Sequence, residues 1–239
     1  FFKRANRNEN PPYDYQTRYA ESDPLPELLH VPTGAGKTAT VVLSWLWRRF
    51  AAKLPAPRRL AYCLPMRVLV NQTADNARRW IDNLDLGDQV RVHVLMGGVH
   101  ADDWELEPER PAILIGTQDM LLSRALNRGY GCSRYRWPMP FGLLNTDCQW
   151  VFDEVQLMGA AVRTSAQLAG FRNTFPSLAA CPSVWMSATV ESDWLRTVDH
   201  PLPGEGFRTL RLDFSKDLGE GSPLRRRMHA PKSLRRCRV

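Results

Sequence analysis

The chain has 239 residues, 44% hydrophobic and 24% charged, as expected of a soluble globular protein, and its apolar runs are too short to cross a membrane. Its five cysteines include no C-x-x-C pair, which disfavours a zinc site or a disulfide framework and leads us to expect a cytoplasmic protein. The net charge of +7 is weak evidence for a nucleic-acid surface, because residues 224–239 hold seven of the 32 basic residues and none of the 25 acidic ones.

The first 26 residues are polar and rich in proline, so we expect an irregular lead-in at 1–26. We expect no signal peptide in this polar opening, and because the chain starts with Phe1 we expect a segment from within a longer gene. From 27 to 201, short apolar runs alternate with stretches of helical periodicity. We expect strands at 27–31, 59–64, 90–96, 112–116, 149–152 and 183–186. We expect helices from 36 onward and at 68–84, 118–126, 160–172 and 192–198.

This alternation predicts an α/β fold with a mostly parallel sheet and helices on both faces. Residues 127–142 contain three glycines and two prolines and should form a loop. Beyond 201 the pattern weakens. We expect 202–239 to be a basic, largely disordered tail, with one further candidate strand at 207–214.

The segment V-P-T-G-A-G-K-T at 31–38 lies between an expected strand and an expected helix. Glycines in such a loop allow backbone N–H groups to surround phosphate oxygens, and the following helix points its positive end at them. Lys37 would contact the β- and γ-phosphates of ATP, and the Thr38 hydroxyl would bind Mg²⁺. The nucleotide-binding residues predicted in this loop are Thr33, Gly34, Ala35, Gly36, Lys37 and Thr38. Val31 replaces the glycine that usually comes first.

The segment V-F-D-E-V-Q at 151–156 places two carboxylates at the end of an apolar strand. An Asp-Glu pair alone is usually a solvated turn, but a phosphate-binding loop upstream favours a phosphoryl-transfer site. Asp153 would then hold Mg²⁺, and Glu154 would orient and deprotonate the attacking water. Ser187 and Thr189 of S-A-T follow the next expected strand, where they could either cap a helix or relay the state of the γ-phosphate.

In this order the three segments resemble superfamily 2 helicases, whose first RecA-like domain carries them. The segments L-P-M-R-V-L-V-N-Q-T (64–73), L-M-G-G (95–98), G-T-Q-D-M-L-L-S-R-A-L (116–126), D-E-V-Q-L-M-G (153–159) and V-D-H-P (198–201) narrow the likeness. They resemble the helicase-nuclease of type I CRISPR interference. That resemblance implies a RecA-like domain at 27–201, single-stranded DNA as substrate, and recruitment by a Cascade-type surveillance complex in antiviral defence.

The resemblance also assigns roles to single residues. It implies that Gln16 reads adenine, although a glutamine in a surface loop would look the same, and that Gln156 belongs to the catalytic set with Lys37, Asp153 and Glu154. Residues that would touch the DNA backbone are Arg67, Thr73, Thr117 and Gln118; each could instead cap a helix. The arginines and aromatic residues of 127–142 could stack on bases or only pack the loop down. Trp45, Trp150 and Trp185 are better explained by core packing.

The chain offers too few residues after Thr189 for a second RecA-like domain, and its five histidines are scattered, so we find no nuclease site. We therefore expect a fragment that binds Mg-ATP weakly and hydrolyses it slowly. Three alternatives stay open: the motor of another superfamily 2 translocase such as a restriction enzyme, a truncated non-catalytic remnant that binds nucleotide, and a metabolite kinase. The last accounts for neither D-E-V-Q nor S-A-T.

Overall fold

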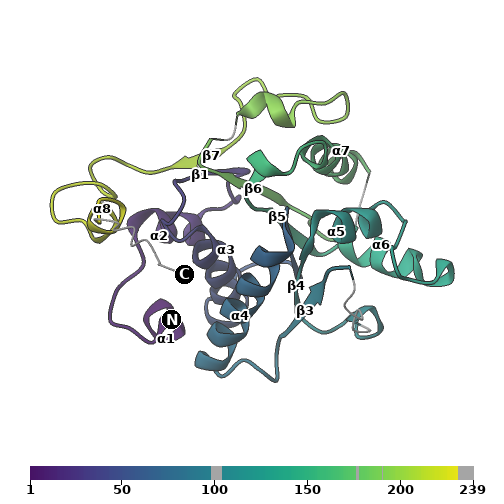
Figure 1. The fold of residues 1–239 in the computed structure, drawn as a ribbon, viewed down its shortest axis with the longest axis horizontal. Helices are drawn as coiled ribbons and strands as arrows, with labels where there is room; N and C mark the ends of the chain where they lie inside the picture. Colours follow the sequence, from purple (N-terminus) through teal and green to yellow (C-terminus); the bar gives the residue numbers. More distant parts are fainter. Residues whose placement is uncertain (98–103, 176–177, 190, 231–239) are drawn as a thin grey trace, which may run out of the picture.

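A parallel sheet of seven strands forms the centre of the fold (Figure 1). The computed structural model describes residues 1–97, 104–175, 178–189 and 191–230. Every strand pair is parallel, and the strand order is β3-β4-β2-β5-β6-β1-β7. The strands are β1 (Leu28–His30), β2 (Arg59–Leu64), β3 (Arg91–Leu95), β4 (Ala112–Thr117), β5 (Cys148–Phe152), β6 (Ser183–Ser187) and β7 (Thr209–Arg211).

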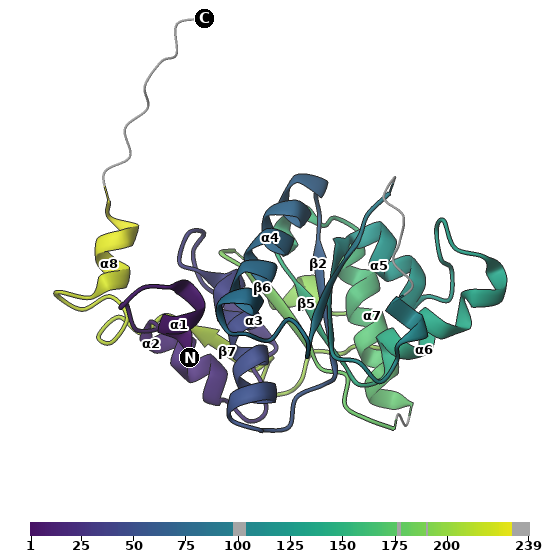
Figure 2. The ribbon, with the colours of Figure 1, turned by 90° about the horizontal axis from the view of Figure 1, so that it is seen from below.

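Helices cover both faces of the sheet (Figure 2). One face carries α1 (Phe2–Asn6), α2 (Asp14–Glu21), α3 (Lys37–Leu46), α4 (Arg67–Asn83) and α8 (Pro223–Met228). The other carries α5 (Gln118–Ala125), α6 (Pro138–Asn145) and α7 (Ala161–Thr174). Shorter helical turns lie at Trp47–Ala51, Trp104–Leu106, Arg134–Arg136, Val155–Leu157 and Ser192–Leu195. In the described part of the chain, no helix is both long and apolar enough to span a bilayer.

Two hydrophobic cores result, one on each face, and they confirm the expected packing of three tryptophans. Trp45 is 1% exposed in the core under α3 and α4. Trp150 and Trp185 lie on the opposite face, where both stack on Phe152 at ring-centroid distances of 5.3 and 5.7 Å. Alternate residues of each strand thus serve different cores, as the two-residue repeat of a β-strand requires.

The expected irregular lead-in at 1–26 is wrong, because two helices form there. The prolines at 11, 12, 24 and 26 flank α2 rather than interrupt it. Tyr15 and Tyr19, four residues apart on one helix face, are both fully buried against α3. The α1 helix is held by α4, since Trp80 Nε1 donates to Asn6 Oδ1 (3.1 Å) and Asn83 Nδ2 donates to the Ala5 carbonyl (2.7 Å).

Residues 127–142 are also more regular than expected, because α6 begins inside them at Pro138. Pro138 and Pro140 lie in the first turn of α6, where a missing backbone N–H breaks no helical hydrogen bond. Proline in this segment therefore starts a helix and does not mark a loop.

The expected disordered tail at 202–239 is corrected for its described part, residues 202–230. β7 forms within the candidate strand 207–214 and extends the sheet beside β1. Farther on, Asp217 is 1% exposed and Leu224 of α8 is fully buried. Residues 231–239, with Lys232 and the last three arginines, lie outside the described residues.

Candidate functional site

The loop between β1 and α3 is shaped by two glycines in left-handed conformations. Gly34 has φ 85° and Gly36 has φ 91°, and a Cβ at Gly36 would lie 3.2 Å from Gln16 Nε2. The Tyr15 hydroxyl donates to the Ala35 carbonyl (2.6 Å) and fixes the loop from outside. Val31, which replaces the usual first glycine, is fully buried and belongs to the core. The loop therefore lies at a helix N-terminus, a position that would suit an anionic ligand.

Lys37, the first residue of α3, lies across the loop from the acidic pair. Its side chain is 5% exposed, and Nζ is 3.4 Å from Glu154 Oε1. No acceptor within the described residues gives this buried ammonium a well-formed hydrogen bond. A buried cation with an incomplete hydrogen-bond set fits an anionic ligand, because such a group otherwise costs stability.

Thr38 and Asp153 are joined by a residue that the sequence did not suggest, Tyr62 of β2. The Tyr62 hydroxyl donates to Asp153 Oδ2 (2.7 Å) and lies 3.2 Å from Thr38 Oγ1. The hydroxyl of Thr38 and the carboxylate of Asp153 therefore meet within the reach of one phenol oxygen. Mg²⁺ prefers oxygen ligands, and the structure brings the two predicted ones to the same phenol oxygen.

Burial is the main influence on the protonation of this pair. It raises the pKa of Asp153 above its ordinary value of 3.8, while the Tyr62 hydrogen bond and the Lys37 charge act in the opposite direction. Burial also raises the pKa of Tyr62 well above 10.0, so the phenol stays a donor. A divalent cation would relieve the cost of burying the Asp153 carboxylate.

A chain of hydrogen bonds connects the acidic pair to the end of β6. Glu154 adopts a left-handed conformation (φ 51°), and its Oε2 accepts from Gln156 Nε2 (2.6 Å). Ser187 Oγ then donates to Gln156 Oε1 (2.6 Å) and accepts from the Thr189 backbone N–H (3.0 Å). The predicted coupling residues therefore touch the predicted catalytic ones through a continuous path.

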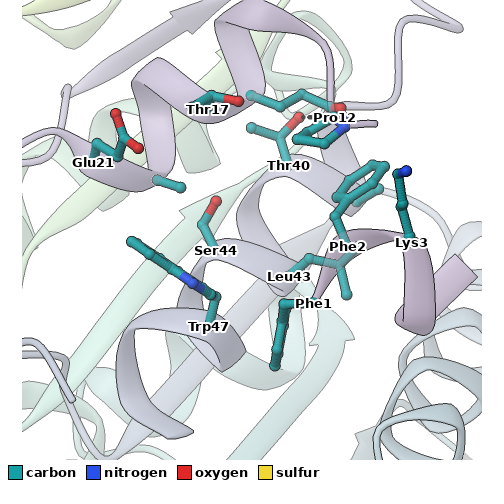
Figure 3. Close-up of a pocket in the computed structure, with 13 residues that line it drawn as sticks. Phe1, Phe2, Lys3, Pro12, Thr17, Glu21, Thr40, Leu43, Ser44 and Trp47 are labelled. Atoms are coloured by element: carbon teal, nitrogen blue, oxygen red, sulfur yellow. Dashed lines mark hydrogen bonds between the residues drawn. The ribbon is translucent and has the colours of Figure 1, made fainter. Parts of the chain in front are cut away.

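A cavity of about 650 Å³ opens onto these groups. Its walls include Thr33, Gly34, Gly36, Lys37, Thr38, Asp153 and Glu154. A volume of this size is typical of small-ligand sites. An adjoining cavity of about 370 Å³ lies between α1, α2 and α3 and shares Phe2, Gln16 and Ala39 with the first. Figure 3 shows the apolar and polar side chains that line it.

Gln16 lies between the two cavities and is 4% exposed, so it is not a residue of a surface loop. Its Nε2 donates to Thr40 Oγ1 (3.1 Å) and to the Gly36 carbonyl (3.4 Å), and its Oε1 accepts from the Tyr13 N–H. Both ends of the amide are engaged with protein groups. Gln16 therefore braces α2 against the phosphate-binding loop.

The residues predicted to contact nucleic acid fall into two places. Arg67, Thr117 and Gln118 lie at the carboxyl edge of β2 and β4, where Arg67 donates to the carbonyl of Gly97 after β3. Gln118 Oε1 is buried and has no hydrogen-bond partner within the described residues. Thr73 is separate from them, because it is buried on α4 in the wall of the larger cavity.

The segment 127–142 is partly packed and partly open. Trp137 Nε1 donates to the Cys132 carbonyl (3.0 Å), and Arg136 pairs with the buried Glu105 (2.7 Å). In contrast, Tyr130 is 66% and Tyr135 96% exposed. The tryptophan thus fastens the segment, while the two tyrosines are accessible.

Known proteins resemble this chain in sequence profile and in fold. A sequence profile described as DEAD/DEAH box helicase matches residues 25–198. No curated protein sequence matches the chain. The solved structure of the DUF1998 helicase MrfA bound to DNA resembles it with a TM-score of 0.61 and 18% identity, over 87% of this chain and 29% of the other. The structure of MrfA bound to DNA and AMPPNP has a TM-score of 0.62 and 17% identity, over 88% of this chain and 29% of the other. The structure of the DEAD-box helicase Mss116 bound to ssRNA and UDP-BeF has a TM-score of 0.55 and 17% identity, over 80% of this chain and 39% of the other.

At such identities the structural likeness shows the fold alone, which is the RecA-like α/β fold expected from the sequence. The chain spans only 29–39% of the length of these helicases. The family profile, however, covers well over half of this chain and includes the phosphate-binding loop, the acidic pair and S-A-T. The chain therefore belongs to the DEAD/DEAH box helicase family.

Proposed function

We propose that this chain is the first motor domain of an ATP-dependent single-stranded DNA translocase that acts in type I CRISPR interference. The observation that carries the ATPase part is the meeting of Lys37, Thr38, Asp153 and Glu154 around one cavity, with Tyr62 joining two of them. Lys37 and the loop N–H groups would hold the phosphates. Thr38 and Asp153 would hold Mg²⁺, which when bound offsets charge on the phosphate oxygens.

In the proposed reaction Glu154 orients a water molecule and takes its proton while the water oxygen attacks the γ-phosphorus. The bond from that phosphorus to the bridging oxygen breaks, giving ADP and inorganic phosphate. The Gln156 side chain already bonds to both neighbours: its Nε2 donates to the Glu154 carboxylate, and its Oε1 accepts from the Ser187 hydroxyl. A change in the position of the Glu154 carboxylate would therefore be transmitted to the end of β6.

The base would lie in the smaller cavity, beside Gln16 and against Phe2 and Pro12 (Figure 3). The Gln16 amide would exchange its present partners for the adenine edge. A Gln16→Ala variant should then lose preference for ATP over GTP. An unchanged preference in this variant would limit Gln16 to bracing the loop.

The ATPase proposal is tested with the purified chain. Lys37→Ala should abolish Mg-ATP binding, whereas Glu154→Gln should retain binding and lose about 10²–10⁴-fold in turnover, as expected for removal of a general base. Wild-type turnover should itself be slow, because a second RecA-like domain normally supplies an arginine worth roughly 10³–10⁵ in rate in related enzymes. Equal nucleotide affinity in wild type and Lys37→Ala would reject the proposal.

The CRISPR assignment is supported by the L-P-M-R and D-E-V-Q-L-M-G segments and needs its own test. Single-stranded DNA should stimulate ATP turnover more than single-stranded RNA of the same sequence. The complete gene product should bind a Cascade-type surveillance complex only when that complex holds its target DNA. Preference for RNA, or binding that does not depend on the target, would favour another translocase of superfamily 2.

A further inference from the structure

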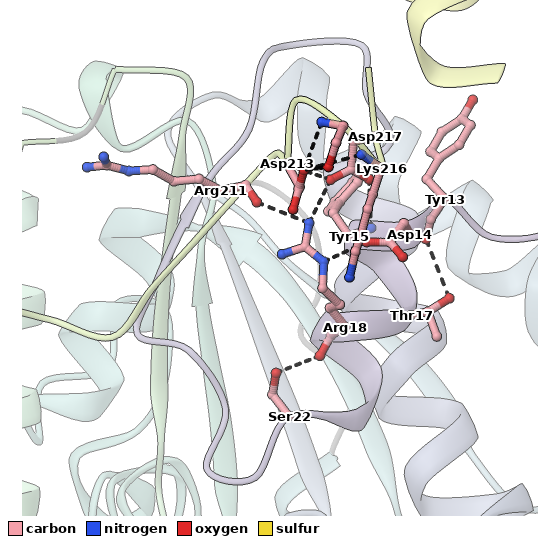
Figure 4. Close-up of polar contacts among 11 residues, drawn as sticks. Tyr13, Asp14, Tyr15, Thr17, Arg18, Ser22, Arg211, Asp213, Lys216 and Asp217 are labelled. Atoms are coloured by element: carbon pink, nitrogen blue, oxygen red, sulfur yellow. Dashed lines mark hydrogen bonds and ion pairs between the residues drawn. The ribbon is translucent and has the colours of Figure 1, made fainter. Parts of the chain in front are cut away.

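The segment that follows β7, residues 213–228, contacts α2 through Asp217 (Figure 4). Farther along, it reaches the 650 Å³ cavity. Its anchor is Asp217, whose side chain is fully buried. One carboxylate oxygen accepts from the Tyr15 N–H (2.9 Å), and the other accepts from the Asp213 N–H (2.8 Å) and from Arg18 Nη2 (2.6 Å). A buried carboxylate with three donors is well compensated, so this attachment is specific.

The same anchor fixes the start of α8. Ser222 Oγ donates to the Asp217 carbonyl, and it also accepts from the Arg225 N–H (3.5 Å) at the N-terminus of α8. Leu224, in the first turn, is fully buried in the core shared with α2 and α3. The helix is therefore held by a capping contact and by a buried side chain.

This attachment makes α8 part of the wall of the 650 Å³ cavity. Pro223 and Arg227 line it together with Thr33, Lys37 and Glu154. The charged residues in the described lining are Lys37, Arg79, Arg227, Asp153 and Glu154, so cations exceed carboxylates by one. Arg227 is exposed, and no carboxylate of the described residues pairs with it. It is a free cation facing a site shaped for polyphosphate.

We propose that Arg227 contacts the phosphates of the bound nucleotide from within the same chain, and that Asp217 is the residue that positions it. This inference rests on the proposed nucleotide binding. It adds a wall of the site from a segment that lies outside the matched family region, 25–198.

The test measures binding of Mg-AMPPNP by calorimetry to wild type, Arg227→Ala, Arg227→Lys and Arg226→Ala. Arg227→Ala should weaken binding roughly three- to tenfold, as expected for one partly exposed charge-assisted contact. Arg227→Lys should keep most of the affinity. Arg226 is the matched control, because it lies on the same helix, is exposed and does not line the cavity. Its removal should leave affinity unchanged.

Two further readouts separate a phosphate contact from a structural role. The ratio of the Mg-AMPPNP dissociation constants of Arg227→Ala and wild type should approach one as the ionic strength rises to about 0.5 M, because salt screens an exposed charge pair. Asp217→Asn should weaken binding at least as much as Arg227→Ala, because Asp217 also holds α2, and adding Arg227→Ala to Asp217→Asn should cause no further loss. Cooperative melting of both single variants should show that they are folded. If Asp217→Asn unfolds, the Arg227 variants alone decide the proposal.

Arg227→Ala binding with wild-type affinity, or equal losses in Arg227→Ala and Arg226→Ala, would overturn the inference. Lys37→Ala keeps this failure distinct from failure of the proposed function. If Lys37→Ala loses binding while Arg227→Ala does not, only the role of Arg227 is refuted. If wild type itself does not bind Mg-AMPPNP, both proposals fall together.

Discussion

Replacing Tyr62 by phenylalanine should destabilise the nucleotide-free protein by about 2 kcal/mol. The ring is fully buried in β2, and phenylalanine keeps its shape, so the change removes one hydroxyl and leaves little new space. That hydroxyl donates to the buried Asp153 carboxylate at 2.7 Å. Hydrogen bonds to charged groups contribute roughly 1.5–3 kcal/mol to stability. In a chain of 239 residues, about 2 kcal/mol lowers the melting temperature by roughly 4–8 °C.

Urea unfolding measures this effect, with Tyr19→Phe as the matched control. Tyr19 is also fully buried, but its hydroxyl accepts its hydrogen bond from a neutral group, Gln149 Nε2, at 3.4 Å. Its loss should cost about 1 kcal/mol or less. The transition midpoint should fall in both variants while the slope stays constant, since neither change alters the surface exposed on unfolding.

The pH dependence identifies the charged partner. The Tyr62 hydrogen bond lowers the pKa of Asp153, so Tyr62→Phe raises that pKa further above 3.8. The destabilisation is therefore fully present where Asp153 is ionised and declines as the pH falls through its folded-state pKa. The cost of Tyr19→Phe should not follow this change. Equal, pH-independent losses in the two variants would refute the claim that Tyr62 compensates the buried carboxylate.

Three further outcomes are expected. Burial raises the pKa of Asp153 above 3.8, so the free energy of unfolding should fall as the pH rises from 3.8 through the folded-state pKa. Asp153→Asn should remove this decrease in urea titrations, and the same pH dependence in wild type and variant would contradict the reasoning. Gln156→Ala should leave Mg-AMPPNP affinity within about twofold but slow ATP turnover roughly tenfold or more, since Gln156 touches Glu154 and Ser187 rather than the cavity; unchanged turnover would exclude a role. Gly170→Ala should cost more than about 2 kcal/mol, because its Cβ would lie 2.0 Å from the Asp199 carbonyl oxygen. Gly142→Ala, in open space on α6, should be neutral or stabilising, and equal effects of the two substitutions on melting temperature would contradict this contrast.

Local signals were sufficient for the centre of the fold. The strand expected at 59–64 is β2 with the same bounds, and the helix expected at 118–126 differs from α5 by one residue. Both segments are buried on two sides or bordered by glycine and proline. The hydrophobic pattern therefore indicates the type of element, and the glycine and proline residues indicate where it ends. The phosphate-binding loop and the acidic pair were predicted for the same reason, since each follows directly from a buried parallel strand.

Tyr62 shows where local signals end. It lies in the middle of an apolar strand, and its neighbours Leu60 and Leu64 face the same core. Only the sheet order puts β2 beside β5, and only that contact gives the hydroxyl a carboxylate to bind. One signal was available, because a buried tyrosine usually needs a hydrogen-bond partner. The identity of the partner still required the three-dimensional arrangement.

The wrong predictions for 1–26 and 202–239 have the same cause, because each of these segments is ordered by contacts with residues far away in the sequence. Tyr15 and Asp217 are 202 positions apart, and neither segment has the apolar content to form a core alone. Together they bury the Asp217 carboxylate, which pairs with the half-buried Arg18, and they pack the rings of Tyr15 and Tyr19 into the core with α3. The contact also extends to the phosphate-binding loop. Asp217 holds the backbone of α2, and α2 holds the phosphate-binding loop through Tyr15 and Gln16. The chain after β7 and the phosphate-binding loop are therefore connected by hydrogen bonds that run through Asp217 and α2.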